Sequence, residues 1–291
     1  MKDIRSTRYS CVSMLVFGTL FLIPPAIAQP AVQIKGSDTL IYLGQRVASI
    51  YQGGPNSLLQ IQGGGPPQTI SPNQIAQWEG KSRGESGADV IFPIGVQTIV
   101  IYVNRANPVR ELTLAQVRKI FLGQITNWKE FGGTDSRILL YAGESSTGTL
   151  VYFQEGLLRD EEPYPFVGKS NTKDLLDEIA QHPDAIGYGS LASNPDVRPI
   201  SIKVGPASLA IEPTRDNIRS RQYPITRYIY WAVSSKANAS AMTLCHWVLS
   251  ASGQLVIESV GFEPLLPSDR AAGLSKLDGA AARVLPVSAN R

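Results

Sequence analysis

The sequence predicts an α/β protein with mixed sheets, and three observations support this. Short apolar runs typical of strands alternate with segments whose apolar residues recur at helical spacing. The 291 residues, 43% apolar and 18% charged, suffice for a sizeable core or for two lobes and exclude an intrinsically disordered chain. A polytopic membrane protein is also excluded, because the chain contains only one long apolar run.

The first 28 residues have the features of a secretory signal peptide. Three basic residues precede a mostly apolar stretch at residues 12–27, and an Ala-Ile-Ala cleavage sequence precedes Gln29. A membrane anchor is the alternative, although the run is short and interrupted by a Pro-Pro pair. Cleavage removes three basic residues and one acidic residue, leaving 24 Lys and Arg against 23 Asp and Glu. The exported chain therefore has no expected polyanion-binding surface.

Strands are predicted where short apolar runs end at glycine, proline or polar residues. They cover residues 32–35, 57–61, 89–94, 98–103, 138–141, 185–189 and 228–233. Three consecutive glycines at residues 63–65 follow the second of these strands. Residues 194–222 are polar and read as irregular, and the chain from about residue 268 reads as loosely held.

Helices are predicted between these strands from apolar residues three or four positions apart. The apolar positions are 40, 43, 47 and 50; 114, 117, 120 and 121; 150, 153 and 157; 175, 176 and 179; and the run at about 240–250. Asp38 or Thr39 is available to cap the first helix. Thr113 and Gln116 form a capping box at the start of the second helix, and Gly123 is placed to end it.

Most patterns of catalytic and metal-binding residues are missing. Cys11 lies in the signal sequence, so Cys245 alone remains after export; it excludes an internal disulfide and reads as a buried hydrophobe. His182 reads as a loop residue and His246 as part of an apolar helix, so no metal site is expected. No Gly-x-Ser-x-Gly elbow occurs. A pair of carboxylates in space stays open, because no spacing favours one pair.

Three turns of small residues follow predicted strands, at residues 36–39, 63–65 and 145–149. Two of them open a helix, whose N-terminus leaves backbone N–H groups unpaired and carries partial positive charge. Small residues let an anion approach these groups, and hydroxyls add donors. Capping and turn chemistry could explain each turn singly. Together, in an exported α/β protein with few catalytic residues, they favour anion capture over catalysis.

These turns belong to a series of segments that resembles the phosphate-type substrate-binding proteins of ABC importers. The matching segments are residues 34–40 (Ile-Lys-Gly-Ser-Asp-Thr-Leu), 62–65 (Gln-Gly-Gly-Gly), 103–109, 112–128, 144–149 (Glu-Ser-Ser-Thr-Gly-Thr), 185–188, 223–227 (Tyr-Pro-Ile-Thr-Arg), 253–254 and 261–262. They occur in the family's order and cover nearly all of the mature chain. Each motif is modest, but their order together is specific.

The resemblance implies a type II periplasmic-binding-protein-like fold. Two lobes, each a mixed sheet flanked by helices, would be joined by a two-strand hinge and close on phosphate. Residues 29–100 and 230–291 would form the first lobe with a C-terminal tail, and residues 101–229 the second lobe. The hinge would lie near residues 101–102 and 228–231, where the chain crosses between the lobes.

The resemblance also implies an oxyanion site shared by both lobes, with no catalytic residue, metal or cofactor. Its residues would be Ser37, Thr39, Leu40, Gly64, Gly65, Ser82, Arg83, Ser146, Thr147, Gly148 and Thr149. Amides and hydroxyls at residues 39–40 would serve the first lobe, and those at residues 147–149 the second.

The sequence departs from the family pattern mainly at charged positions. The family commonly has an arginine where this chain has Gly143, and often a serine where it has Pro66. Losing a charge-assisted arginine–phosphate contact removes about 1.5–3 kcal/mol. Arg83 supplies the charge if its loop folds inward; a solvated surface arginine is the alternative. The family's aspartate that accepts the proton of hydrogen phosphate has no clear counterpart, since Asp89 reads better as the start of a strand.

We therefore expect a monomeric, exported solute-binding protein, periplasmic or secreted, that is not an enzyme and has no nucleic-acid partner. It would capture phosphate or a similar tetrahedral oxyanion and deliver it to an ABC permease. A divergent sensor or interaction module of the same fold, without phosphate specificity, is one alternative. A secreted hydrolase is another, because oxyanion stabilisation and anion binding look alike in sequence, although no activated nucleophile is apparent.

Overall fold

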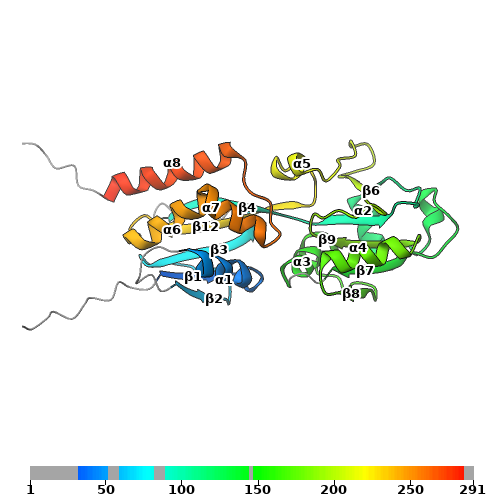
Figure 1. The fold of residues 1–291 in the computed structure, drawn as a ribbon, viewed down its shortest axis with the longest axis horizontal. Helices are drawn as coiled ribbons and strands as arrows, with labels where there is room; N and C mark the ends of the chain where they lie inside the picture. The colour runs from blue at the N-terminus through cyan, green and yellow to red at the C-terminus, as the bar shows by residue number, and fades with distance from the viewer. Residues whose placement is uncertain (1–31, 52–58, 82–88, 144–146, 285–291) are drawn as a thin grey trace, which may run out of the picture.

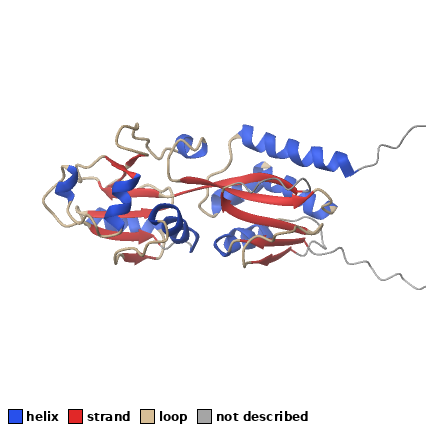
Figure 2. Cartoon of the chain, turned by 180° about the vertical axis from the view of Figure 1, so that it is seen from behind, coloured by secondary structure: helices blue, strands red, loops and turns tan. Residues whose placement is uncertain are grey.

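The computed structural model of the protein describes residues 32–51, 59–81, 89–143 and 147–284. These residues form two lobes, each with a five-stranded mixed sheet and helices packed beside it. The lobes lie end to end along the longest axis of the molecule (Figure 1), and the view from behind shows the same division (Figure 2). The predicted fold class is therefore confirmed. The predicted signal peptide lies outside the described residues.

The sheet of the first lobe combines strands from both halves of the chain, in the order β2-β1-β3-β12-β4. The strands are β1 (Val32–Gly36), β2 (Leu59–Gln62), β3 (Gln74–Gly80), β4 (Asp89–Thr98) and β12 (Thr226–Ser234). The helical elements are η1 (Asp38–Leu40), α1 (Ile41–Ile50), α6 (Ala239–Leu249), α7 (Ala251–Ser259) and α8 (Pro267–Val284). β1 runs parallel to β2 and β3, whereas β12 runs antiparallel between β3 and β4. This order places β3 at the centre of the sheet, between β1 and β12.

The sheet of the second lobe has the order β10-β5-β9-β7-β8. Its strands are β5 (Val100–Asn104), β7 (Leu139–Gly143), β8 (Val167–Lys169), β9 (Ala185–Gly189) and β10 (Val197–Pro199). A separate parallel pair is formed by β6 (Glu111–Thr113) and β11 (Ser201–Lys203). The helical elements are α2 (Leu114–Phe121), η2 (Trp128–Phe131), α3 (Thr147–Tyr152), the π-helical turn η3 (Phe153–Leu158), α4 (Thr172–Gln181) and α5 (Arg215–Arg219).

The chain crosses between the two sheets at two adjacent places. Thr98 ends β4 in the first sheet, and Val100 already begins β5 in the second. The return crossing ends at Thr226, where β12 enters the first sheet. Ile225 O accepts hydrogen bonds from Ile99 N at 3.1 Å and from Thr98 Oγ1 at 3.0 Å, so the crossings are bonded to each other. The predicted lobe boundaries at 100/101 and 229/230 lie close to these crossings, and the hinge stays a prediction.

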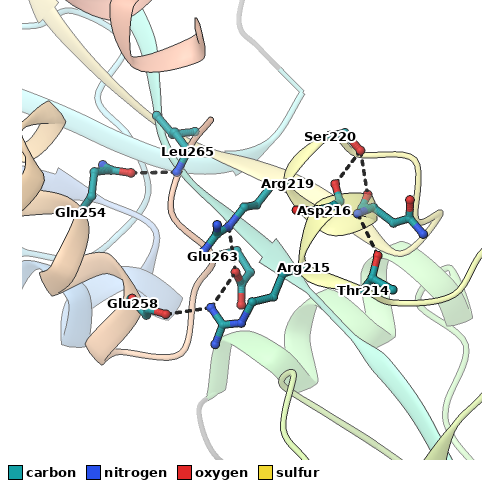
Figure 3. A network of polar contacts seen from close by, with 10 residues as sticks. Thr214, Arg215, Asp216, Arg219, Ser220, Gln254, Glu258, Glu263 and Leu265 are labelled. Atoms are coloured by element: carbon teal, nitrogen blue, oxygen red, sulfur yellow. Dashed lines mark hydrogen bonds and ion pairs between the residues drawn. The ribbon is translucent and has the colours of Figure 1, made fainter. Parts of the chain in front are cut away.

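A polar network surrounds Glu263 near the crossings (Figure 3). The side chain of Glu263 is only 7% exposed, and its Oε2 lies 3.2 Å from Arg215 Nη1 and 3.2 Å from Arg219 Nε. Both arginines come from α5, whereas Glu263 is paired through its backbone with Val96 of β4. The network therefore ties α5 to the first lobe close to the place where β4 leaves it.

Two local signals in the sequence are confirmed. Thr113 Oγ1 accepts from Gln116 N at 3.1 Å while Gln116 Oε1 accepts from Thr113 N at 2.7 Å, which is the predicted capping box of α2. Gly123 follows the end of α2 with φ of +68°, the left-handed conformation that favours glycine. Cys245 is fully buried in α6, and burial raises the pKa of its thiol.

Several sequence-based expectations were wrong where polar residues interrupt the apolar pattern of a strand or helix. Residues 74–80 form the central strand β3, which was not predicted because Gln74 and Gln77 interrupt its apolar pattern. Residues 194–222 contain β10, β11 and α5 rather than an irregular segment, with fully buried Ile202 and Ile218. Thr98 belongs to the end of β4, not to the start of the next strand.

The C-terminal region also differs from its expectation. The chain from about residue 268 was expected to be loosely held, but α8 spans Pro267–Val284 and packs along β4 and α6. Leu277 of α8 is fully buried, and Lys276 Nζ donates to Ile91 O at 3.1 Å. α8 extends along the outer side of the first lobe (Figure 1). Among the described residues, none of the helices has the length and apolarity that a membrane crossing requires.

Candidate anion-binding site

A cavity of about 560 Å³ lies between residues of the two lobes. Its lining is Ser37, Asp38, Thr39, Gly65, Pro66, Trp78, Glu79, Lys81 and Arg227 from the first lobe, with Val151 and Glu155 from the second. η1 of the first lobe lies against α3 of the second beside this cavity. Two of the three small-residue turns singled out in the sequence, at residues 36–39 and 63–65, therefore line the same cavity.

Glu79, near the end of β3, is the centre of the polar contacts in this cavity. Its Oε1 accepts hydrogen bonds from Ser37 Oγ at 3.0 Å, from Thr39 Oγ1, and from Arg227 Nη2 at 3.2 Å. The side chain is 7% exposed, and Oε2 is buried without a hydrogen bond to any described residue. Leaving a buried acceptor unpaired costs about 1–3 kcal/mol, so such an atom marks a place that a donor is expected to occupy.

Arg227, at the start of β12, joins residues of both lobes. Its side chain is 10% exposed, and Nε donates to Gln97 Oε1 at 2.8 Å in addition to the contact with Glu79. Nη1 lies 3.8 Å from Glu155 Oε2, and the guanidinium lies 4.0 Å above the ring of Tyr152. Burial lowers the pKa of Arg227 and the carboxylate of Glu79 opposes this shift, so the guanidinium stays charged.

The backbone amides of the glycine turn bind it to the end of β1 and to η1. Gly64 N donates to Asp38 Oδ1 at 2.9 Å, and Gly65 N donates to Gly36 O at 2.9 Å. Gly64 and Gly65 have φ of +85° and +80°, and a Cβ at Gly63 would lie 1.9 Å from Asp38 Oδ1. Glycine is required here by close approach and by left-handed backbone. Asp38 therefore holds the turn and does not cap α1.

The predicted site residues of the first lobe have different surroundings. Ser37, Thr39 and Gly65 line the cavity. The side chain of Leu40 is buried in the core, and its amide donates to Ser37 O at 3.0 Å. The amides of Leu40, Gly64 and Gly65 are thus already hydrogen-bonded within the protein. The expectation that Asp38 or Thr39 caps the first helix was wrong, because both side chains contact other partners.

In the second lobe, Thr147 and Gly148 begin α3, and the next residue, Thr149, is a buried polar residue, 3% exposed. The remaining predicted site residues, Ser82, Arg83 and Ser146, lie outside the described residues. The anion-binding role of this whole set stays a prediction.

Sequence reasoning missed Glu79 and Arg227. The sequence offered no clear carboxylate, because Asp89 was read as the start of a strand, which it is in β4, and the positive charge was expected at Arg83. Arg227 closes the segment Tyr-Pro-Ile-Thr-Arg, which had already been singled out, and was the available signal. Glu79 could have been found only by recognising β3. Within the described ranges, no three His, Cys, Asp or Glu side chains are grouped so as to hold a metal ion.

A model of the PBP superfamily domain matches residues 76–252, more than half of the chain. The chain belongs to the PBP superfamily. The matched span begins in β3 and ends in α7, so it includes both crossings and both sides of the cavity.

Two of the relatives that this PBP superfamily member matches in sequence are phosphate-binding proteins. It is 25% identical over 249 residues to the phosphate-binding protein PstS of Bacillus subtilis, covering 82% of each chain. It is 25% identical over 266 residues to PstS of Pseudomonas aeruginosa, covering 79% of this chain and 81% of the relative.

Solved structures agree with the fold. A possible phosphate binding protein from Planctomyces limnophilus superposes with a TM-score of 0.76 at 20% identity, over 86% of this chain and 98% of its own. An ABC-type phosphate transport receptor from Vibrio cholerae superposes with a TM-score of 0.64 at 24% identity, over 81% of this chain and all of its own (100%). At these identities the likeness establishes the two-lobed fold alone.

Proposed function

We propose that the protein is an exported, monomeric solute-binding protein that captures hydrogen phosphate between its lobes and delivers it to an ABC permease. The observation that carries this proposal is the group of Ser37, Thr39 and Arg227 around Glu79, whose second oxygen is buried without a partner. The group combines donors for an oxyanion with one acceptor for a proton.

Three side chains supply hydrogen-bond donors for the oxyanion. Arg227 offers a charged, planar set of N–H groups, which suits the oxygens of phosphate. The hydroxyls of Ser37 and Thr39 donate to Glu79 and can rotate toward an anion in the cavity. Arg227 thereby takes the place of the arginine that the family commonly has at the position of Gly143. It also takes over the part that the sequence alone gave to Arg83.

Glu79 supplies the specificity. An ionised carboxylate only accepts hydrogen bonds, so it is attracted to an oxyanion that still carries a proton and repelled by one that does not. Phosphate keeps at least one proton at neutral pH, whereas sulfate keeps none. Glu79 Oε2 is the expected acceptor because it has no other described partner. Glu79 would then do the work of the family's aspartate, for which the sequence offered no counterpart.

Export and delivery rest on other observations. The N-terminal 28 residues have the pattern of a cleaved signal peptide, which favours a periplasmic or secreted location. The similar Vibrio cholerae structure is described as an ABC-type phosphate transport receptor, and the PstS relatives match over most of their length. The two bonded crossings provide a natural hinge, so we expect ligand contacts in both lobes to favour a closed state.

Isothermal titration calorimetry tests the proposal on the chain without residues 1–28. We expect a heat of binding on adding phosphate and none on adding sulfate at the same millimolar concentration. Arsenate should bind no more tightly than phosphate. No heat with phosphate would overturn the proposal. Equal binding of phosphate and sulfate would retain anion capture but overturn the role given to Glu79.

A further inference from the structure

A second compartment of about 770 Å³ continues from the anion cavity. The two compartments share Glu79, Lys81, Glu155 and Arg227 in their linings, so they meet where the anion is proposed to bind. Both lie in the size range of sites for small organic molecules, about 300–1,000 Å³. A tetrahedral inorganic anion beside Glu79 occupies the first compartment and leaves the second without a function.

Aromatic side chains form one wall of this second compartment. Tyr228 and Tyr230 are two positions apart on β12 and therefore project from the same face of the sheet. In the register with β3, Tyr230 is opposite Trp78 and Tyr228 is opposite Gly80. The rings of Trp78 and Tyr230 are stacked with centroids 5.6 Å apart, and Tyr228 meets Tyr230 edge to face, also at 5.6 Å. We call Tyr228 and Tyr230 the aromatic wall; Trp78 lines the first compartment and supports the wall by stacking on Tyr230.

Space is left open beside the aromatic wall. Gly80 lines the compartment with φ of +100°, and a Cβ built there would meet no atom within 4 Å. Any other residue at this position would place a side chain next to the ring of Tyr228, since the two residues are cross-strand partners. The glycine therefore keeps clear a volume that a ring of a ligand could fill.

The ring of Tyr228 is held in place from two sides. The guanidinium of Arg221 lies 4.2 Å from the centroid of the ring. The Tyr228 hydroxyl donates to Asp269 Oδ2 at 2.8 Å. Burial, together with Asp269, raises the pKa of Tyr228 to about 12, so the phenol stays neutral. A ring fixed in this way presents a preorganised surface, which reduces the entropy lost when a ligand stacks on it.

We propose that the site also binds phosphate monoesters that carry a planar ring, with the phosphoryl group at Arg227 and the ring on the aromatic wall. This inference rests on the proposed function, because it uses the same anion position. In a monoester one phosphate oxygen carries the organic group, and below the second pKa of about 6 the monoester keeps one proton that Glu79 can accept. The link would pass the shared residues Glu79 and Arg227 from one compartment to the other.

Three ligands separate the two compartments in a calorimetric titration of the mature chain at about pH 5, where each ligand keeps a proton: inorganic phosphate, methyl phosphate and phenyl phosphate. Methyl phosphate has the ester link without the ring, so its comparison with phenyl phosphate isolates the aromatic wall. We expect phenyl phosphate to bind about 2- to 12-fold more tightly than methyl phosphate, the range that an aromatic contact supplies.

Tyr230→Leu should remove this difference and leave the affinity for inorganic phosphate unchanged. Tyr42→Leu is the matched control, because Tyr42 lies on α1, 61% exposed, and does not line either compartment. Circular dichroism should show that both variants are folded.

The outcomes distinguish this inference from the proposed function. Equal affinities for phenyl and methyl phosphate, with inorganic phosphate bound, overturn the inference and leave the proposed function intact. A ring advantage that persists in Tyr230→Leu also overturns it. No binding of inorganic phosphate overturns the proposed function, whereas phenyl phosphate binding that depends on Tyr230 would still support the aromatic wall as a ligand site.

Discussion

Arg227 Nη2 lies 3.2 Å from Glu79 Oε1 in the first lobe, and Nη1 of the same side chain lies 3.8 Å from Glu155 Oε2 of the second lobe. The two carboxylates differ in exposure, since Glu79 is 7% exposed and Glu155 is 59% exposed. An exposed ion pair contributes little free energy, so an incoming anion can replace Glu155 as a partner of Arg227 at small cost. We expect the buried Glu79 to remain paired with Arg227 when an anion binds.

Glu79→Gln should broaden the choice of anion. The glutamine amide can donate a hydrogen bond, which a fully deprotonated anion accepts, so we expect sulfate to bind this variant measurably. Phosphate affinity should fall by about 10-fold or more, because the acceptor for its proton loses its charge. Calorimetry with both anions measures the two effects. Glu130→Gln, at an exposed position of η2, is the control; sulfate binding there would contradict the assignment.

Arg227→Gln should weaken phosphate binding most. Removing a charge-assisted hydrogen bond costs about 1.5–3 kcal/mol, or about 12- to 150-fold in dissociation constant. Arg227→Lys should recover part of the loss, since lysine keeps the charge but not the planar set of donors. Arg46→Gln, exposed on α1, tests for a general charge effect. A loss of similar size in Arg46→Gln would exclude a specific contact.

Thr39→Val should test the hydroxyl contribution without changing the shape of the side chain. The hydroxyl donates to Glu79, and we expect about 2- to 13-fold weaker phosphate binding without it, the range of one ordinary hydrogen bond. Thr243→Val, on an exposed position of α6, provides the comparison. Unchanged affinity in Thr39→Val would leave Ser37 and Arg227 as the donors.

Two glycine-to-alanine changes should shift stability in opposite directions. At Gly63 the new Cβ would lie 1.9 Å from Asp38 Oδ1 and disturb the hydrogen bond that Gly64 N donates to this oxygen, so the free energy of unfolding should fall. At Gly279 in α8 nothing lies within 4 Å, and alanine should raise it by about 0.5–1 kcal/mol. Urea unfolding measures both; a stabilised Gly63→Ala would contradict the close approach.

Leu277→Ala should show that α8 is part of the folded core. Leu277 is fully buried, and truncating such a leucine costs about 2–5 kcal/mol of unfolding free energy. Leu255→Ala is the matched control, because that leucine on α7 is 66% exposed and its loss should change stability by less than about 0.5 kcal/mol. Equal effects would mean that α8 is held as weakly as its sequence suggests.

The sequence predicted the features that depend on neighbouring residues. The capping box of Thr113 and Gln116 and the terminating Gly123 involve contacts within one turn of helix, so the local pattern was sufficient. Alternating strands and helices gave the α/β class for the same reason. The two-lobed arrangement came from the resemblance to a family, because no local pattern specifies it.

The centre of the candidate site could not be predicted in the same way. Glu79 meets Ser37 across 42 positions and Arg227 across 148 positions of the sequence. These contacts arise from the strand order β1-β3-β12, and β3 itself was hidden by its two buried glutamines. An unpaired oxygen on Glu79 is a property of the folded packing, so no sequence pattern announces it.

Only Ile99 separates the last residue of β4 from the first residue of β5, and its side chain is fully buried. A tether of one residue contributes two soft torsion angles, φ and ψ, and packing restricts even these. The lobes therefore cannot drift apart or reorient freely, as bodies on a long linker would. If the lobes open and close on a ligand as we propose, we expect the motion to be a rotation about an axis through Ile99 and Ile225, which would keep the facing surfaces of the cavity aligned.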